Sequence, residues 1–199
     1  IEKSVLSSVV PLLNETFSRM IKKLTGHDPF VIAPPMYSKL PVSVPSSAVH
    51  EIGTDILCDA IAAWDTYHDA CIVVDFGTAL TFTAIGDDAE IRGVAIAPGL
   101  RTAVKALFRD TAQLPSVPLE VPPSSLGTNT IHAIQSGVVL GYKGLLESLI
   151  GRMRADLGSN VPVIATGGLS SVLQDDTEIF ERIDPLLTLK GLRIAADCF

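Results

Sequence analysis

The sequence predicts an α/β protein, and three of its features support this class. Short apolar runs rich in β-branched residues, such as 71–74 and 161–165, are typical of buried strands. Longer segments with apolar residues three or four positions apart, such as 54–67, are typical of helices. Strands and helices alternate along the chain, and a content of 47% hydrophobic and 19% charged residues is that of a globular protein.

The first half of the chain is expected to contain two strands, two helices and a long loop. In order, these are a strand over 2–10, a helix over 11–24, a strand over 30–33, an irregular loop over 34–50 and a helix over 54–67. Pro11 suits the first turn of a helix, and Gly26 suits the position just beyond a helix end. The prolines and the serine pair of 34–50 account for the expected loop.

The second half is expected to begin with three consecutive strands. In order, we expect strands over 71–74, 80–85 and 91–96, a proline-rich loop over 115–123, a long or broken helix over 129–157, a strand over 161–165 and the start of a helix over 169–173. Three strands followed by helices favour the sheet of an RNase-H-like domain. Along the long helix, Gly137, Gly141, Gly144 and Ser148 share one side, and small residues at this spacing permit the close approach of another helix.

Composition and charge argue against several classes of partner. A formal net charge of −7 disfavours general nucleic-acid binding, which needs a basic surface. No apolar run approaches the ~18 residues that a membrane span needs, and no signal-peptide pattern is present. The cysteines Cys58, Cys71 and Cys198 have no CxxC spacing, so we expect reduced thiols in a cytoplasmic protein.

The strongest chemical motif follows the first strand of the second half. That strand delivers Asp75, after which Gly77 allows a tight turn, and Thr78 and Thr81 supply hydroxyls among backbone N–H groups. Such a loop can hold phosphate oxygens while the carboxylate holds a cation or its waters. The competing interpretation is an ordinary hairpin in which Asp75 caps the turn.

A second motif is the glycine pair Gly167–Gly168, which lies between a strand and the expected start of a helix. Bare backbone at this position lets a nucleotide approach a helix N-terminus, although the pair also fits a tight structural turn. Together and in this order, the two motifs resemble the phosphate and adenosine motifs of the actin-like ATPase superfamily.

Three further segments narrow the resemblance to one family. They are the run from Gly93 through Pro98-Gly99 to Leu100, the Asn129-Thr130 pair ahead of Ser136-Gly137, and the Gly53-Thr54-Asp55 triplet at a helix start. In this order the segments resemble the type III pantothenate kinases, which begin coenzyme A synthesis, and the resemblance runs from Ser7 to Leu192. It implies an actin-like fold of two RNase-H-like domains, the remainder of the first over 1–69 and the second over 70–199, facing each other over a nucleotide cleft. It also implies phosphorylation of pantothenate by ATP.

The same resemblance implies roles for individual residues. Asp55 matches the general base that accepts the proton of the substrate hydroxyl, and Asp75 matches the ligand of a monovalent cation, potassium or ammonium. The expected ATP contacts are Gly77, Thr78, Thr81, Gly167 and Gly168, with magnesium on the phosphates, and the expected pantothenate contacts are Gly53, Thr54 and Thr130. In the family Thr130 acts across a dimer interface, so a homodimer is implied. Asp55 also fits a plain helix-start carboxylate.

The departures from the family pattern leave other functions open. Ile56 stands where the family has an arginine that binds the substrate carboxylate, and the other departures are Ser46, Thr83 and Val94. The family's first phosphate loop is absent, and the chain opens at Ile1 on a strand-like segment, so we expect that a natural segment precedes it. The alternatives are a divergent binding or regulatory homologue, or a kinase of the same superfamily with another substrate. If pantothenate is the substrate, Arg101 and Lys105 are the nearby cations that can replace the arginine.

Overall fold

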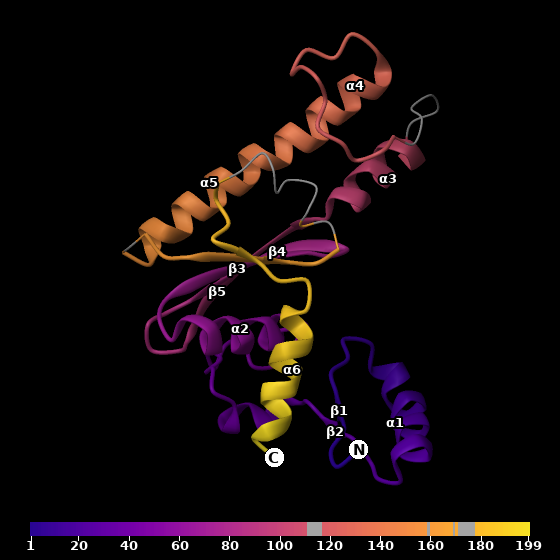
Figure 1. Cartoon of the computed structure of the whole chain (residues 1–199), viewed down its shortest axis with the longest axis vertical. Coiled ribbons are helices and arrows are strands. Elements are labelled where there is room, and N and C mark those ends of the chain that lie inside the picture. Colours follow the sequence, from indigo (N-terminus) through magenta and orange to yellow (C-terminus); the bar gives the residue numbers. More distant parts are fainter. Residues whose placement is uncertain (111–116, 159, 169, 171–177) are drawn as a thin grey trace. The chain divides into compact units, whose positions relative to one another are not determined.

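The computed structural model describes residues 1–110, 117–158, 160–168, 170 and 178–199. They form two compact units. The first unit comprises Ile1–Cys71, Ile85–Gly93 and Leu186–Phe199, and the second comprises Ile72–Ala84 and Val94–Pro185. Figure 1 labels the elements of both units.

The first unit begins with a short parallel strand pair that flanks a helix. Strands β1 (Val5–Leu6) and β2 (Phe30–Val31) pair in parallel, and α1 (Pro11–Thr25) connects them. The strand expected over 2–10 is therefore much shorter. A physical reason lies at Ser8, whose hydroxyl accepts the N–H of Val10 at 3.1 Å and turns the chain toward α1. The expected loop over 34–50 contains a 3₁₀ helix, η1 (Pro34–Lys39), because its two prolines suit a first helical turn.

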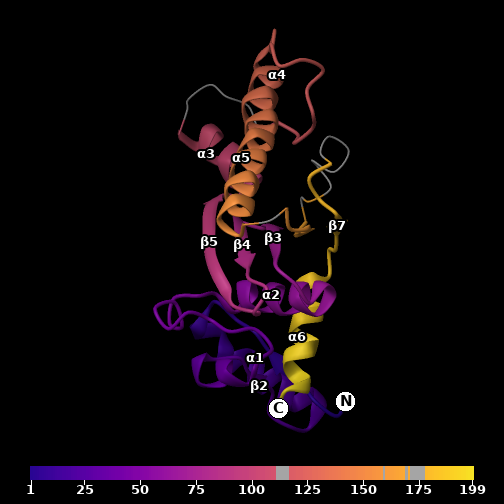
Figure 2. The same cartoon turned by 90° about the vertical axis from the view of Figure 1, so that its left-hand side faces the viewer.

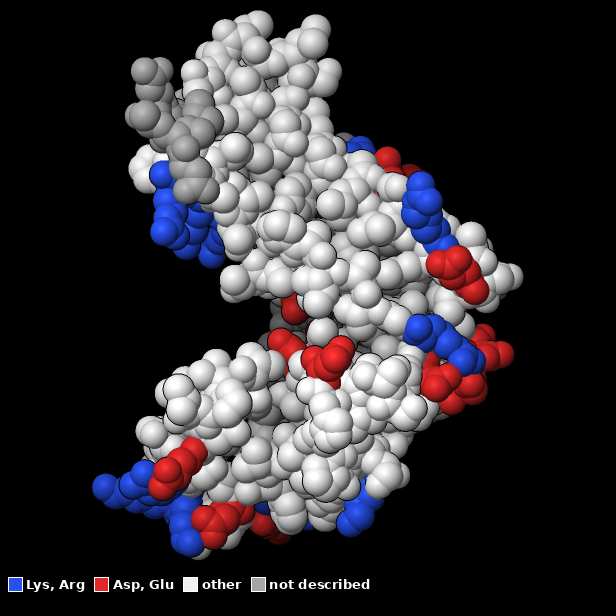
Figure 3. Space-filling model, turned by 180° about the vertical axis from the view of Figure 1, so that it is seen from behind, with Lys and Arg blue, Asp and Glu red and all other residues white. Residues whose placement is uncertain are grey.

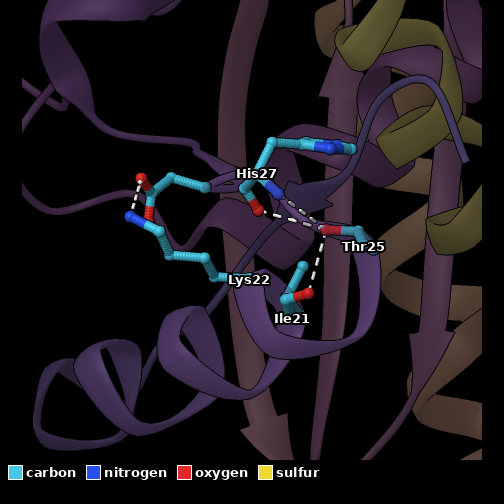
Figure 4. A network of polar contacts seen from close by, with 5 residues as sticks. Ile21, Lys22, Thr25 and His27 are labelled. Carbon is cyan, nitrogen blue, oxygen red and sulfur yellow. Dashed lines mark hydrogen bonds and ion pairs between the residues drawn. The ribbon is translucent and has the colours of Figure 1, made fainter.

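Helix α1 ends where the sequence predicts. Gly26 takes the left-handed conformation with φ 86°, and its N–H donates to Lys22 O at 2.8 Å. The Thr25 hydroxyl donates to Ile21 O at 2.9 Å and lies 3.1 Å from His27 O (Figure 4). These bonds satisfy carbonyls at the end of the helix, so the change of direction toward β2 is fixed locally.

The core of the first unit is the packing of α2 (Thr54–Tyr67) against α6 (Leu187–Asp197). The two helices lie side by side in both views (Figures 1 and 2). A Cβ at Gly191 would overlap the carbonyl oxygen of Cys58, so the two backbones touch at that glycine. Beside this contact the Thr188 hydroxyl donates to Asp59 Oδ1 at 2.6 Å. The bounds of α2 are those predicted, whereas α6 was not among the expected elements.

A five-stranded sheet in the order β5-β4-β3-β6-β7 forms the centre of the second unit. Its strands are β3 (Cys71–Phe76), β4 (Ala79–Ile85), β5 (Ile91–Pro98), β6 (Val163–Thr166) and β7 (Arg182–Ile183). The three consecutive strands are confirmed. Residues 71–74 are fully buried because β3 is central and is covered on both faces, and β6 runs parallel to it.

The second unit also contains a long, interrupted helix and a shorter helix that packs beside it. The expected long helix is confirmed as α4 (Thr130–Gln135), a π turn (Ser136–Leu140) and α5 (Gly141–Asp156) in succession. Helix α3 (Leu100–Asp110) was not predicted and packs beside the π turn around Val104 and Val138. Among the described residues, nothing lies within 4 Å of a Cβ built at Gly137, Gly141 or Gly144, so these glycines make no close backbone contact with another described helix. The helix start expected over 169–173 falls almost wholly outside the described residues.

Candidate functional site

The two glycine motifs of the sequence meet at one edge of the sheet. Strands β3 and β6 are parallel neighbours, and in their register Asp75 pairs with Thr166. The loop Gly77–Thr78 follows β3, and the pair Gly167–Gly168 follows β6. In open α/β sheets, ligands bind outside the carboxyl ends of the strands. The structure therefore brings together Asp75, Gly77, Thr78, Gly167 and Gly168, which are distant in the sequence.

Gly167 makes the close contact between the two loops possible. Its φ is +89°, a conformation that favours glycine. A Cβ at this position would lie 2.5 Å from Asp75 Oδ1 and 2.7 Å from both the backbone N and the backbone C of Phe76. No side chain fits there without displacing the end of β3. The Asp75 carboxylate thus faces the backbone of Gly167.

The start of α3 holds the Gly77–Thr78 loop from the other side. Thr78 O accepts the N–H of Gly99 at 3.0 Å and the hydroxyl of Thr102 at 2.7 Å. A Cβ at Gly99 would overlap the carbonyl oxygen of Gly77. The sequence resemblance includes Gly99, but nothing in the sequence assigned Thr102 to this loop. The i, i+4 spacing of Leu100, Val104 and Phe108 was the signal that could have revealed α3.

A pocket of about 340 Å³ opens on these loops. Its described lining residues are Phe76, Gly77, Thr78, Arg101, Thr102, Lys105 and Gly168. Backbone from two loops and the cations Arg101 and Lys105 thus border one cavity. Backbone N–H groups of a turn and basic side chains are the groups that bind phosphate and carboxylate oxygens in proteins. The pocket is therefore suited to an anionic ligand.

A second cavity, of about 590 Å³, lies at the start of α4 and contains Thr130. The helix start is capped by Asn129, whose Oδ1 accepts the N–H of His132 at 2.9 Å. Gly127, Ile134, Gly137 and Val138 also line the cavity, which makes its wall largely apolar. Thr130 is exposed at the first turn, so its hydroxyl is accessible to a ligand.

The Gly53-Thr54-Asp55 triplet belongs to the first unit, where it begins α2. Gly53 is the N-cap, and Thr54 accepts a hydrogen bond from the Ser7 hydroxyl at 2.7 Å. Asp55 is half-buried, and its Oδ1 accepts the N–H of Ile56 at 2.9 Å. Asp55 therefore occupies the first turn of α2, next to the helix N-terminus.

The remaining predicted residues are not among the described lining residues of the two cavities. Thr81 is half-buried on β4 and does not line the pocket beside Gly77. Of the departures from the family pattern, Thr83 is 2% exposed, and Ser46 and Val94 lie on the surface.

The residues that the structure describes contain no group of three or more His, Cys, Asp or Glu side chains arranged to hold a metal ion. None of their helices has the length and apolar character required to cross a bilayer. On the face shown in Figure 3, acidic and basic side chains are interspersed, and the basic ones form only small clusters.

Comparison with known proteins connects this geometry with one family. The family model described as type III pantothenate kinase matches residues 1–152. A type III pantothenate kinase of Treponema pallidum (strain Nichols) is 46% identical over 187 residues, which cover 94% of this chain and 68% of the relative. One from Moorella thermoacetica is 42% identical over 194 residues, which cover 98% of this chain and 76% of the relative.

A solved structure has a similar fold. It is described as a Baf family transcriptional activator from Campylobacter jejuni, and it superposes with a TM-score of 0.67 at 20% identity, covering 99% of this chain and 83% of that one. At this identity the likeness concerns the fold alone. The α/β class predicted from the sequence is confirmed by the described helices and strands. Because the family model covers most of the chain and the relatives match nearly all of it, this protein belongs to the type III pantothenate kinase family.

Proposed function

We propose that the protein transfers the terminal phosphoryl group of ATP to a hydroxyl of pantothenate. Family membership supports the reaction, and one structural observation supports the site. This observation is the pocket formed where the Gly77–Thr78 loop and the Gly167–Gly168 pair meet at the ends of adjacent parallel strands. Phosphoryl transfer depends mainly on positioning and on electrostatic stabilisation of the phosphates, and these loops supply both.

ATP is proposed to bind with its phosphates against Gly77 and Thr78. The backbone of Gly168 borders the same pocket, and Gly167 keeps the two loops in contact. Backbone N–H groups and the Thr78 hydroxyl are donors to phosphate oxygens, and Thr81 is the further contact expected from the family. Magnesium accompanies the nucleotide because it binds mainly through phosphate oxygens and water.

Asp75 is the proposed ligand of a monovalent cation. Its carboxylate lies beside Gly167 and near Gly77 and offers two oxygen donors. Oxygen donors suit hard cations such as potassium. A potassium or ammonium ion held there would neutralise charge next to the phosphates, and this is the chemistry that the ion supplies. The carboxylate oxygens of Asp75 fit such an ion.

Asp55 is the proposed general base. The pantothenate hydroxyl attacks the γ-phosphorus, the bond to the bridging oxygen of ADP breaks, and the hydroxyl proton passes to the Asp55 carboxylate. Gly53 and Thr54 on the same turn are the proposed substrate contacts, together with Thr130. In this proposal Thr130 acts on a second copy of the chain, so the protein is a homodimer. Its proposed location is the cytoplasm.

The proposed function is tested by replacing Asp55 with Asn, which keeps the shape of the side chain but removes its basicity. We expect turnover of ATP and pantothenate to fall about a hundredfold or more, the scale of general-base removal. ATP binding measured by calorimetry should persist. Asp65 is exposed on the same helix, so Asp65→Asn is the matched control and should leave turnover unchanged. Unchanged turnover in Asp55→Asn would remove Asp55 from the mechanism.

Ile56 favours a second candidate function. Where the family has an arginine, this chain offers only an apolar side chain, which cannot pair with the pantothenate carboxylate. A binding or regulatory homologue, or a kinase with another substrate, would account for this residue. Calorimetry separates these alternatives, because a binding protein takes up ATP without product formation and an altered kinase phosphorylates a different hydroxyl compound.

A further inference from the structure

Arg101 and Lys105 form a pair of cations on one face of α3. They are separated by four positions, which places them one above the other on the helix surface. Both side chains are exposed, and both line the pocket with Gly77, Thr78 and Gly168. The helix is anchored beneath them by Leu100 and Val104, which are 1% and 7% exposed. The two cations are therefore carried on a packed helix with a fixed position in the second unit.

The electrostatics of this pair are unfavourable without a bound anion. Within the described part of the chain, neither side chain makes an ion pair. Like charges at i and i+4 repel each other. Arg101 also lies in the first turn of α3, at the positive end of the helix dipole, and this turn contains no acidic residue. An anion in the pocket would offset both the repulsion between the two cations and the unfavourable position of Arg101 at the helix start.

We propose that Arg101 and Lys105 together bind an oxyanion group of a reactant and thereby determine which reactants the protein accepts. The inference rests on the proposed function, since it concerns the ligands of that same reaction. Two sources share this chemistry, namely a terminal phosphate of ATP and the carboxylate of pantothenate. The phosphate lies beside Gly77 and Thr78 in the proposed mode, and the carboxylate lacks its usual arginine because of Ile56.

The two side chains differ in what they contribute. The planar guanidinium of Arg101 can donate two parallel hydrogen bonds to one phosphate or carboxylate, whereas the ammonium of Lys105 acts as a compact charge. Loss of either charge-assisted contact should weaken the affinity for the reactant by about ten- to a hundredfold. The double variant should lose more than either single variant.

Steady-state kinetics with two acceptors distinguish the two sources. Arg101→Gln, Lys105→Gln and the double variant are compared with Arg109→Gln, which removes a cation from the same helix outside the pocket. The acceptors are pantothenate and pantothenyl alcohol, in which an uncharged hydroxymethyl group replaces the carboxylate. A KM for ATP raised with both acceptors identifies the phosphate. A KM raised for pantothenate but not for the alcohol identifies the carboxylate. Values equal to those of Arg109→Gln in every arm would overturn the inference.

Binding measured without turnover keeps this test independent of the kinase activity. Calorimetric titration with inorganic tripolyphosphate, and separately with pantothenate, needs no phosphoryl transfer. We expect the double variant to lose at least about tenfold in affinity for one of the two probes relative to Arg109→Gln. If the wild-type protein shows no transfer but this loss is seen, the proposed function fails and the anion site stands. If both probes bind equally to the double variant and to Arg109→Gln, the anion site is wrong.

Discussion

At the scale of single residues, the two buried cysteines have raised thiol pKa values. Cys58 and Cys71 are fully buried, and the pKa of each thiol is raised from its ordinary value of 9.0 to about 12. Burial is the main cause, and the neighbouring carboxylates Asp59 and Asp69 contribute to the same shift. Both thiols are therefore protonated and unreactive at neutral pH, because the thiolate is the nucleophile.

The raised thiol pKa values predict how fast each cysteine is labelled and how the free energy of unfolding depends on pH. At pH 8 a thiol reagent should modify Cys198, which is only half-buried, well before Cys58 and Cys71.

Because folding raises the pKa values of Cys58 and Cys71, the stabilisation that these thiols provide is complete below about pH 9 and is lost as the pH rises toward 12. Urea unfolding at pH 7.5 and pH 10 measures this loss. For the labelling experiment, equal rates for all three cysteines would contradict the burial of Cys58 and Cys71.

The sequence predicted the residues of the phosphate loops but not the hydrogen bond from α3 that holds one of these loops in place. Asp75, Gly77 and the Gly167–Gly168 pair carry a local signal, namely a strand followed by glycine, and the structure brings them together. Thr102 carries no such signal, because its bond to Thr78 O joins residues far apart in the sequence. The proposed roles of Asp55, Asp75 and Thr130 stay predictions.

At the scale of elements, the junction of β3 and β6 depends on one glycine. Gly167→Ala places a methyl group against Asp75 and Phe76 and requires a left-handed backbone, so we expect the free energy of unfolding to fall by about 1–3 kcal/mol. Gly168→Ala is the matched control, because no atom of the described residues lies within 4 Å of its Cβ, and it should change stability by less than about 0.5 kcal/mol. Chemical denaturation compares the two. Equal stabilities would show that the loops are not in contact at Gly167.

The packing of α2 against α6 depends on another glycine. Gly191→Ala forces a methyl group into the carbonyl of Cys58, and overpacking of this kind costs about 1–3 kcal/mol. Gly151 is also helical but has open space around it, so Gly151→Ala should stabilise the protein by about 0.5–1 kcal/mol. Thermal unfolding monitored by circular dichroism measures both changes. A Gly191→Ala protein as stable as the wild type would mean that the helices do not touch there.

The elements differ in how well the sequence predicted them. Helix α2 and strand β3 carry strong local patterns, so their positions agree with prediction. Helix α6 was missed, and part of its packing is the contact of Gly191 with the Cys58 backbone, which has no local signature. Strand β1 is shorter than predicted because pairing with β2 involves only Val5 and Leu6. Long-range pairing and backbone contact are the properties that a single sequence conceals.

At the scale of the whole molecule, family membership and the phosphate pocket point to the same reaction. The relatives match nearly the entire chain, and the pocket belongs to the second of its two compact units. The division at 69/70 into two RNase-H-like domains, the homodimer and the monovalent cation stay predictions. The structure groups residues 186–199 with the first unit.

The central claim, phosphoryl transfer from ATP to pantothenate at the Asp75–Thr78 loop, is tested most directly by ³¹P NMR of the protein with magnesium, ATP and pantothenate. In potassium chloride we predict that the γ-phosphate signal of ATP decays while ADP and a single new phosphomonoester appear in equal amounts. In sodium chloride the same change should be much slower, because Asp75 is the proposed ligand of potassium. ATP that stays intact in potassium chloride, or that yields only inorganic phosphate, would contradict the account.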